Sequence, residues 1–148
     1  MRRLIFVSIV MSMVITASNC SSTDPRAGQL ERGKYLVENV VMCADCHTPR
    51  DERGEFVRAK WLQGSPLEFA PVHPMPAWVP SAPGIAGLPQ MSEAEATSLL
   101  ETGATPNGRS PRPPMPSFRL SHEDAVAVAA YLKSLRASAD APLTSQNR

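Results

Sequence analysis

Aromatic side chains are scarce in this chain: they make up 5% of its 148 residues, although 43% of the residues are hydrophobic. A chain of this length suits one domain with a modest core, and a bound cofactor could supply the bulk that aromatic side chains do not. An excess of charge of one sign is also lacking, because 15 basic residues stand against 14 acidic ones. Basic stripes with interleaved aromatic residues are absent, so a nucleic-acid partner is not expected.

Prolines are nearly missing from both ends of the chain. Thirteen of the fifteen lie between Pro49 and Pro116. Because proline interrupts helices, this distribution predicts helices at both ends of the chain and a long irregular middle between them. Such a long irregular stretch is unusual in a compact domain unless something fills the space that it encloses.

Long hydrophobic runs are lacking except at the N-terminus, where residues 4–15 follow Arg2 and Arg3 and precede small residues. This order is typical of a secretory signal, and the run is shorter than the about 20 residues that cross a membrane comfortably. We therefore expect a signal peptide at residues 1–19 and a periplasmic protein. An uncleaved N-terminal anchor is the alternative.

Cysteines number only three, and Cys20 stands apart from the other two. It lies in "TASNC", followed by the polar "SSTD", which resembles a bacterial lipoprotein site, although Asn19 departs from the usual Gly, Ala or Ser. We therefore expect lipidation of Cys20. The lipid would anchor the protein to the membrane, because two or more acyl chains hold a protein there stably. Ordinary cleavage near Ser18 would instead leave Cys20 as a free thiol.

The other two cysteines lie in "CADCH", where Cys43 and Cys46 are separated by two residues and His47 follows directly. Four chemistries use such a pattern: a redox dithiol, half of a zinc site, a disulfide, or covalent haem attachment. A thioredoxin-like dithiol needs a βαβ context, which the surrounding sequence lacks. A structural zinc site needs four ligands, and neither His73 nor His122 has ligand-pair spacing. A disulfide remains the alternative in an oxidising compartment.

Haem attachment explains every position of the motif. Two thiols add across the two vinyl groups of a porphyrin, and the adjacent His47 is then held under the iron as an axial ligand. Cys-x-x-Cys-His is the signature of c-type haem attachment, and export agrees with it, because bacteria make this attachment outside the cytoplasm. We therefore expect one haem c, bound covalently by Cys43 and Cys46.

Helical signals occur in three segments. Apolar residues recur at helical spacing over about 29–41, where Gly33 would suit the close approach of another helix. A second helix is predicted between the cap Ser92 and the stop Gly103. The third starts after the cap Ser121, and small alanines on its apolar stripe would permit a close crossing against Gly33.

The second axial ligand is expected to be Met115. Thioether sulfur suits a haem iron that shuttles one electron, because Met/His ligation raises the potential. Met115 lies in "PRPPMPSF", where prolines stiffen the loop before the last helix. Met75 and His73, in "HPMPAW", are the alternatives, and Met91 is expected to pack in the core.

Arg50 and Trp61 are candidate contacts of the haem propionates. Arginine matches carboxylates in a bidentate manner, and the N–H of a buried tryptophan needs a partner. His122 is expected to be an exposed residue near a helix cap. Four other arginines are further candidates for the propionates: Arg53, Arg109, Arg112 and Arg119.

From about residue 28 to residue 135 the chain resembles class I (mitochondrial-type) cytochrome c domains, on the strength of "RGKYLV", "CADCHTPR" and "PPMPSFRLSHEDAVAVAAYLKSL". It is most similar to single-haem domains of bacterial dehydrogenase cytochrome subunits. The resemblance implies an all-α fold of about three main helices wrapped around one covalent haem, with a proline-rich irregular middle. It also implies His47 and Met115 as the two axial ligands. In this family the first and last helices cross in contact, which matches Gly33 with Tyr131 and Leu132.

The function expected from these features is the transfer of single electrons between a periplasmic donor, such as a dehydrogenase, and a respiratory acceptor, such as an oxidase or another cytochrome. No catalysis of its own is expected. A haem-based sensor or ligand-binding module with a displaceable distal ligand is the alternative. The expected organisation is a signal peptide at 1–19, a polar tether at 20–27, a cytochrome c domain at 28–136 and a flexible tail at 137–148.

Overall fold

The computed structural model describes residues 24–139, with the backbone alone for residues 136–139. The expected signal peptide, the lipidation of Cys20 and most of the expected C-terminal tail therefore lie outside the described residues. Among the helices within the described range, none has the length and apolar character to cross a membrane.

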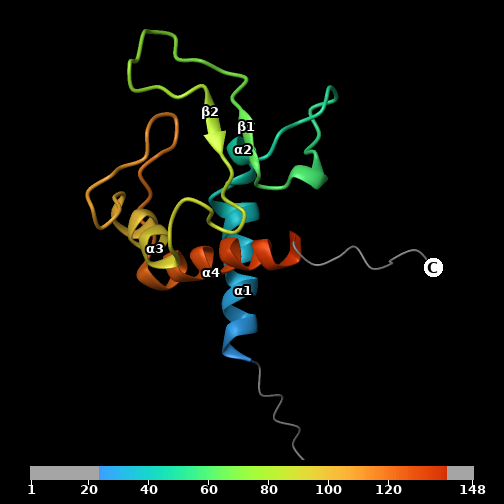
Figure 1. Ribbon diagram of the computed structural model, residues 1–148, viewed down its shortest axis with the longest axis vertical. Coiled ribbons are helices and arrows are strands. Elements are labelled where there is room, and N and C mark those ends of the chain that lie inside the picture. Colours follow the sequence, from blue (N-terminus) through green and yellow to red (C-terminus); the bar gives the residue numbers. More distant parts are fainter. Residues whose placement is uncertain (1–23, 140–148) are drawn as a thin grey trace, which may run out of the picture.

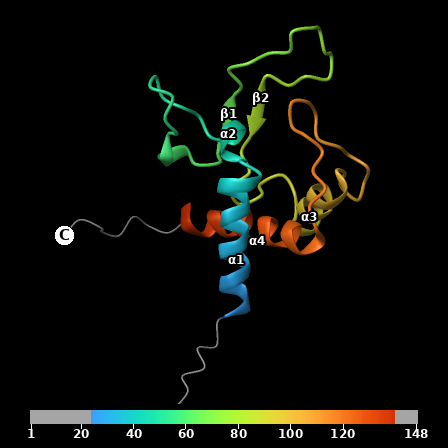
Figure 2. The ribbon, with the colours of Figure 1, turned by 180° about the vertical axis from the view of Figure 1, so that it is seen from behind.

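Three main helices form the body of the molecule, which confirms the all-α expectation. Figures 1 and 2 show α1 and α4 crossing at the centre of the molecule, with α3 packed against α4. The short helix α2 and the two short strands lie past the C-terminal end of α1. The elements in chain order are α1 (Pro25–Tyr35), a π-helical turn (Leu36–Val40), α2 (Ala44–His47), a 3-10 turn (Arg58–Lys60), β1 (Gly64–Pro66), β2 (Ser81–Pro83), α3 (Glu93–Thr102) and α4 (His122–Ala139).

The first helix begins earlier than the predicted 29. Asp24 caps it by accepting a hydrogen bond from the backbone N–H of Arg26 at 2.9 Å, and Pro25 occupies the first helical position, where its missing N–H is not needed. The tether predicted at 20–27 therefore overlaps the first turn of α1. Asp-Pro is a helix-start signal that the apolar periodicity does not register.

The other two helices carry the predicted caps. In α3, Ser92 accepts a hydrogen bond from the N–H of Glu95, whose carboxylate accepts one from the N–H of Ser92. The helix ends at Gly103 in the left-handed conformation. In α4, the hydroxyl of Ser121 accepts a hydrogen bond from the N–H of Asp124 at 3.2 Å. The carboxylate of Asp124 does not return this bond, because it pairs with Arg32 of α1 at 2.9 and 3.2 Å.

The C-terminal helix extends beyond the predicted domain boundary at 136 and ends at Ala139. Alanine is the strongest helix former, so "ASA" continues the helix instead of ending it.

The core forms where α1 and α3 each pack against α4. Gly33 is buried where α1 crosses α4 against Ala127 and Tyr131, which confirms the close crossing expected at this glycine. Met91 is half-buried and packs on the core, as expected. The larger apolar residues of the core are Leu36, Val37, Leu62, Leu88, Leu100, Val128 and Leu132.

The irregular middle contains a small antiparallel sheet that was not predicted. Gly64 pairs with Pro83, and the chain between the strands, residues 67–80, projects away from the helices (Figure 1). Each strand has three residues and no alternation of apolar and polar side chains, so the usual sequence signal of a strand is missing. The sheet matters because it presents the backbone carbonyl of Pro83 to the motif region.

Candidate functional site

The two thiols of the motif lie one helical turn apart at α2. The π-helical turn and Met42, in a left-handed conformation at φ 52°, turn the chain from α1 into α2. The backbone N–H of Cys43 bonds to the carbonyl of Val37 at 3.0 Å, and that of His47 bonds to the carbonyl of Cys43 at 3.0 Å. Cys43 and Cys46 are half-buried free thiols, so the structure does not join them in the disulfide that the sequence left open.

The environment of the thiols opposes a redox dithiol. Burial raises the pKa of Cys43 to about 12, and burial followed by the nearby Asp45 carboxylate raises the pKa of Cys46. Catalytic Cys-x-x-Cys pairs instead depend on a lowered pKa that supplies thiolate at neutral pH. Both cysteines are therefore protonated thiols here, available for covalent attachment to a cofactor.

His47 is buried with 6% of its surface exposed, and its Nδ1 lies 2.7 Å from the carbonyl oxygen of Pro83 in β2. A carbonyl only accepts hydrogen bonds, so Nδ1 carries the proton and donates it. The lone pair is thereby left on Nε2, and this tautomer of the imidazole can bind a metal through Nε2. Burial lowers the pKa of His47 more than the bond to Pro83 raises it, which keeps the ring neutral.

Met115 is half-buried on a loop braced against the segment before β2. The Nε of Arg112 donates to the carbonyl of Ala77 at 3.2 Å, and the N–H of Val79 donates to the carbonyl of Pro113 at 2.9 Å. These bonds tie the Met115 loop to the segment that leads into β2, the strand whose Pro83 holds His47. The alternatives Met75 and His73 are both exposed on the projecting chain, Met75 to 45%.

The candidate propionate contacts already have partners in the protein. The guanidinium of Arg50 bonds to Asp45 at 3.1 Å and lies 3.9 Å from the centre of the Phe56 ring. Trp61 meets the Phe56 ring edge-on at 5.7 Å, and the guanidinium of Arg58 lies 4.6 Å from the centre of the Trp61 ring. Propionate binding by Arg50 and Trp61 stays a prediction.

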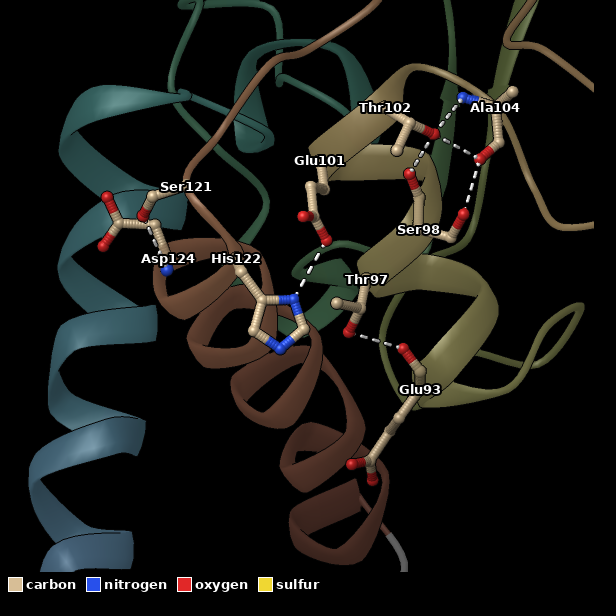
Figure 3. A network of polar contacts seen from close by, with 9 residues as sticks. All are labelled: Glu93, Thr97, Ser98, Glu101, Thr102, Ala104, Ser121, His122 and Asp124. Carbon is tan, nitrogen blue, oxygen red and sulfur yellow. Dashed lines mark hydrogen bonds and ion pairs between the residues drawn. The ribbon is translucent and has the colours of Figure 1, made fainter.

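The remaining polar candidates lie elsewhere. His122 is exposed, as expected, and its Nδ1 lies 3.0 Å from a carboxylate oxygen of Glu101 across the α3–α4 contact (Figure 3). Arg53 pairs with Asp51 within its own turn, and Arg119 donates to the adjacent carbonyl of Phe118. In the part of the chain that the structure describes, no three His, Cys, Asp or Glu side chains gather as a metal site.

Pro83 is the site residue that the sequence did not identify. It contributes through its backbone carbonyl, which every residue type carries, so composition and spacing offer no signal for it. Its contact with His47 spans 36 positions of the chain, and only the pairing of β1 with β2 brings the two together.

The thiols and the imidazole at α2 fit the attachment of a haem group. Two protonated thiols lie on one turn, and the adjacent neutral imidazole has its Nε2 lone pair available. A half-buried thioether on a braced loop is the kind of soft second ligand that haem iron accepts. These residues would hold a haem through Cys43, Cys46, His47 and Met115.

Known proteins similar to this chain are haem proteins by name. A "Diheme cytochrome c-type" protein of Cereibacter sphaeroides is 33% identical over 75% of this chain and 37% of its own length. The "Fructose dehydrogenase cytochrome subunit" of Gluconobacter japonicus is 29% identical over 78% of this chain and 24% of its own. The "Alcohol dehydrogenase (quinone), cytochrome c subunit" of Gluconobacter oxydans is 32% identical over 79% and 25%.

The matched region thus spans about a quarter to somewhat over a third of these relatives. The sequence profile of cytochrome c matches residues 30–136, which include the attachment motif, the Met115 loop, all of α3 and most of α1 and α4. This match covers well over half of the chain and agrees with the arrangement of the thiols and the imidazole at α2. The chain therefore belongs to the cytochrome c family.

Proposed function

We propose that this chain is an exported single-haem cytochrome c that carries single electrons between a periplasmic donor and a respiratory acceptor. Family membership supports an electron-transfer role rather than catalysis, and it implies a covalently bound haem c. The observation that carries the proposal is the buried His47, oriented by Pro83 and directly adjacent to two free thiols.

Haem would supply a one-electron iron couple at this site. The chain's own residues would attach it through Cys43 and Cys46 and ligate the iron through His47 and Met115. The carbonyl of Pro83 orients the imidazole and makes it a stronger donor, while a methionine ligand raises the potential. With His47 and Met115 both holding the iron, no position would be left for a substrate, which suits an electron carrier.

One haem is proposed because the sequence contains one Cys-x-x-Cys-His motif. The diheme description belongs to the Cereibacter relative and is not carried over. Two relatives are named as cytochrome subunits of dehydrogenases, which supports a dehydrogenase as the electron donor. The signal-like N-terminus and Cys20 support export and a lipid anchor.

The test is a visible spectrum of the oxidised full-length chain, expressed with its own N-terminus in a host that matures c-type cytochromes. We expect haem absorption and a weak far-red sulfur-to-iron charge-transfer band. Met115→Ala should remove the band, whereas Met75→Ala, the matched change on the neighbouring loop, should retain it. A colourless folded protein would overturn the haem assignment.

Carbon monoxide separates the carrier from the sensor. A reduced carrier with Met115 bound should not take up carbon monoxide without denaturation, while Met115→Ala should bind it readily. Uptake by the native protein would instead indicate a displaceable distal ligand and favour the haem-based sensor.

A further inference from the structure

Thr48, the residue directly after His47, makes a buried hydrogen bond that reaches far along the chain. It is 1% exposed, and its Oγ1 accepts a hydrogen bond from the backbone N–H of Leu62 at 2.9 Å. Leu62 is completely buried and adopts a left-handed conformation at φ 56°. A leucine is disfavoured there and persists only where its surroundings hold it, so the hydrogen bond that Leu62 donates to Thr48 helps to hold this conformation.

The carbonyl of Leu62 holds the turn that follows β2. It accepts hydrogen bonds from the N–H groups of Ile85 at 2.8 Å and Ala86 at 3.0 Å. Those two residues follow Gly84, which itself follows Pro83. The position of Leu62 therefore sets the position of the turn that carries the Pro83 carbonyl.

The hydrogen bond from His47 to Pro83 closes this path into a ring. Starting at His47, the ring runs through the peptide bond to Thr48, across its hydroxyl to Leu62, on to the turn at Ile85, and back through Pro83 to Nδ1 of His47. The hydroxyl of Thr48 and the imidazole of His47 are the two side-chain groups that take part in it. The remaining members are backbone groups.

We infer that Thr48 is a positioning residue for His47: its hydroxyl holds Leu62, and through Leu62 it holds the Pro83 carbonyl against Nδ1. The hydrogen bond at Nδ1 increases the donor strength of Nε2, so Thr48 sets how strongly His47 would donate to iron. This inference rests on the proposed ligation by His47 and adds a residue that acts through Leu62 and Pro83 instead of binding iron itself.

The experiment replaces Thr48 with Val, which keeps the shape and removes the acceptor, and with Ser, which keeps the hydroxyl. Thr105→Val is the matched control, because Thr105 is also buried and its hydroxyl also bonds to backbone, at Arg109. Two properties are measured on the reduced full-length haem protein with ¹⁵N-labelled histidine. They are the solvent exchange of the His47 Nδ1–H proton by NMR, and the reduction potential.

In Thr48→Val we expect Nδ1–H to exchange about tenfold faster, as loss of one buried hydrogen bond allows local opening. The reduction potential should shift to more positive values, because a weaker donor stabilises the ferric iron less. Thr48→Ser should restore both properties. Thr105→Val should lower the stability without changing either.

Unchanged exchange and potential in Thr48→Val would overturn the inference, as would equal changes in Thr105→Val. If Thr48→Val does not fold, Thr48→Ser still decides, because altered exchange or potential with the hydroxyl present would contradict the ring. Failure of the proposed function looks different. A wild-type preparation without haem, or with haem not ligated by His47, would overturn the function while the Nδ1–H exchange still reports on the ring.

Discussion

Gly33 in α1 makes room for the main-chain carbonyl of Ala127 in α4: a Cβ built at Gly33 would lie 2.0 Å from that oxygen and 2.7 Å from the Cβ of Tyr131. The two helices therefore approach more closely than any side chain at position 33 allows. Because α1 leads through the π-helical turn into Cys43, this crossing also sets where the attachment motif lies relative to α4.

Gly33→Ala should destabilise the fold. The added methyl group would collide with backbone of α4, which cannot turn aside as a flexible side chain can. We expect a loss of about 1–3 kcal/mol in the free energy of unfolding, the usual cost of overpacking, measured by urea denaturation.

Gly28→Ala is the matched control, since Gly28 lies in the same helix and a Cβ there would meet no atom within 4 Å. Alanine is the better helix former, so this variant should be neutral or more stable by up to about 1 kcal/mol. If both substitutions had the same effect, the close crossing would not be what Gly33 provides.

Gly64→Ala should disturb the presentation of Pro83 to His47. Gly64 has φ 95°, and a Cβ there would lie 2.8 Å from the N of Gly84 and 2.9 Å from the carbonyl oxygen of Ala82. We expect β2 to shift, with faster exchange of the His47 Nδ1–H proton measured by NMR.

Gly54→Ala separates this clash from the cost of the backbone conformation. Gly54 also has a positive φ, 82°, but a Cβ there would have open space. Both variants should carry the left-handed cost of roughly 1–2 kcal/mol, and only Gly64→Ala should alter the His47 proton. An altered proton in Gly54→Ala would show that the effect is not specific to β1.

Arg32 and Asp124 should make the stability depend on acid pH. The hydrogen bond from Arg32 holds the pKa of Asp124 below the ordinary 3.8; burial acts against it, and the charge of Arg32 adds to it. A carboxyl with a lowered pKa in the folded state contributes stability above its ordinary pKa and loses it as the pH falls through the folded value.

Asp124→Asn should therefore be less stable than the natural chain at pH 7, and the difference should shrink toward pH 3. Urea denaturation at several pH values measures this, and added salt should reduce the difference because the pair is exposed. A difference that stays constant from pH 7 to pH 3 would contradict the ion-pair explanation.

Ser92→Ala should weaken α3 at its N-terminus. The substitution removes the acceptor of the Glu95 N–H and half of the reciprocal cap. The expected loss is about 1 kcal/mol in the free energy of unfolding, read from thermal or urea denaturation. Ser92→Asp is the control that keeps a capping oxygen; if it lost as much stability as Ser92→Ala, capping would not explain the result.

Several features could be predicted from the sequence because they depend on residues only a few positions apart. The caps at Ser92 and Ser121 and the stop at Gly103 act within one helical turn, so α3 and the start of α4 were predicted correctly. The spacing of Cys43, Cys46 and His47 is likewise local and indicated c-type haem attachment. Together with "RGKYLV" and "PPMPSFRLSHEDAVAVAAYLKSL", the motif indicated the cytochrome c family. Met115 as the second ligand stays a prediction.

Only the tertiary structure decided how the motif is supported. The pairing of Gly64 with Pro83, the hydrogen bond from His47 to Pro83 and the bond from Leu62 to Thr48 join positions far apart in the chain. Most of these partners are backbone carbonyl and N–H groups, which every residue carries and which therefore leave no mark on composition or spacing. Local chemistry determined which residues could hold the cofactor, whereas long-range backbone hydrogen bonds determined the orientation of His47.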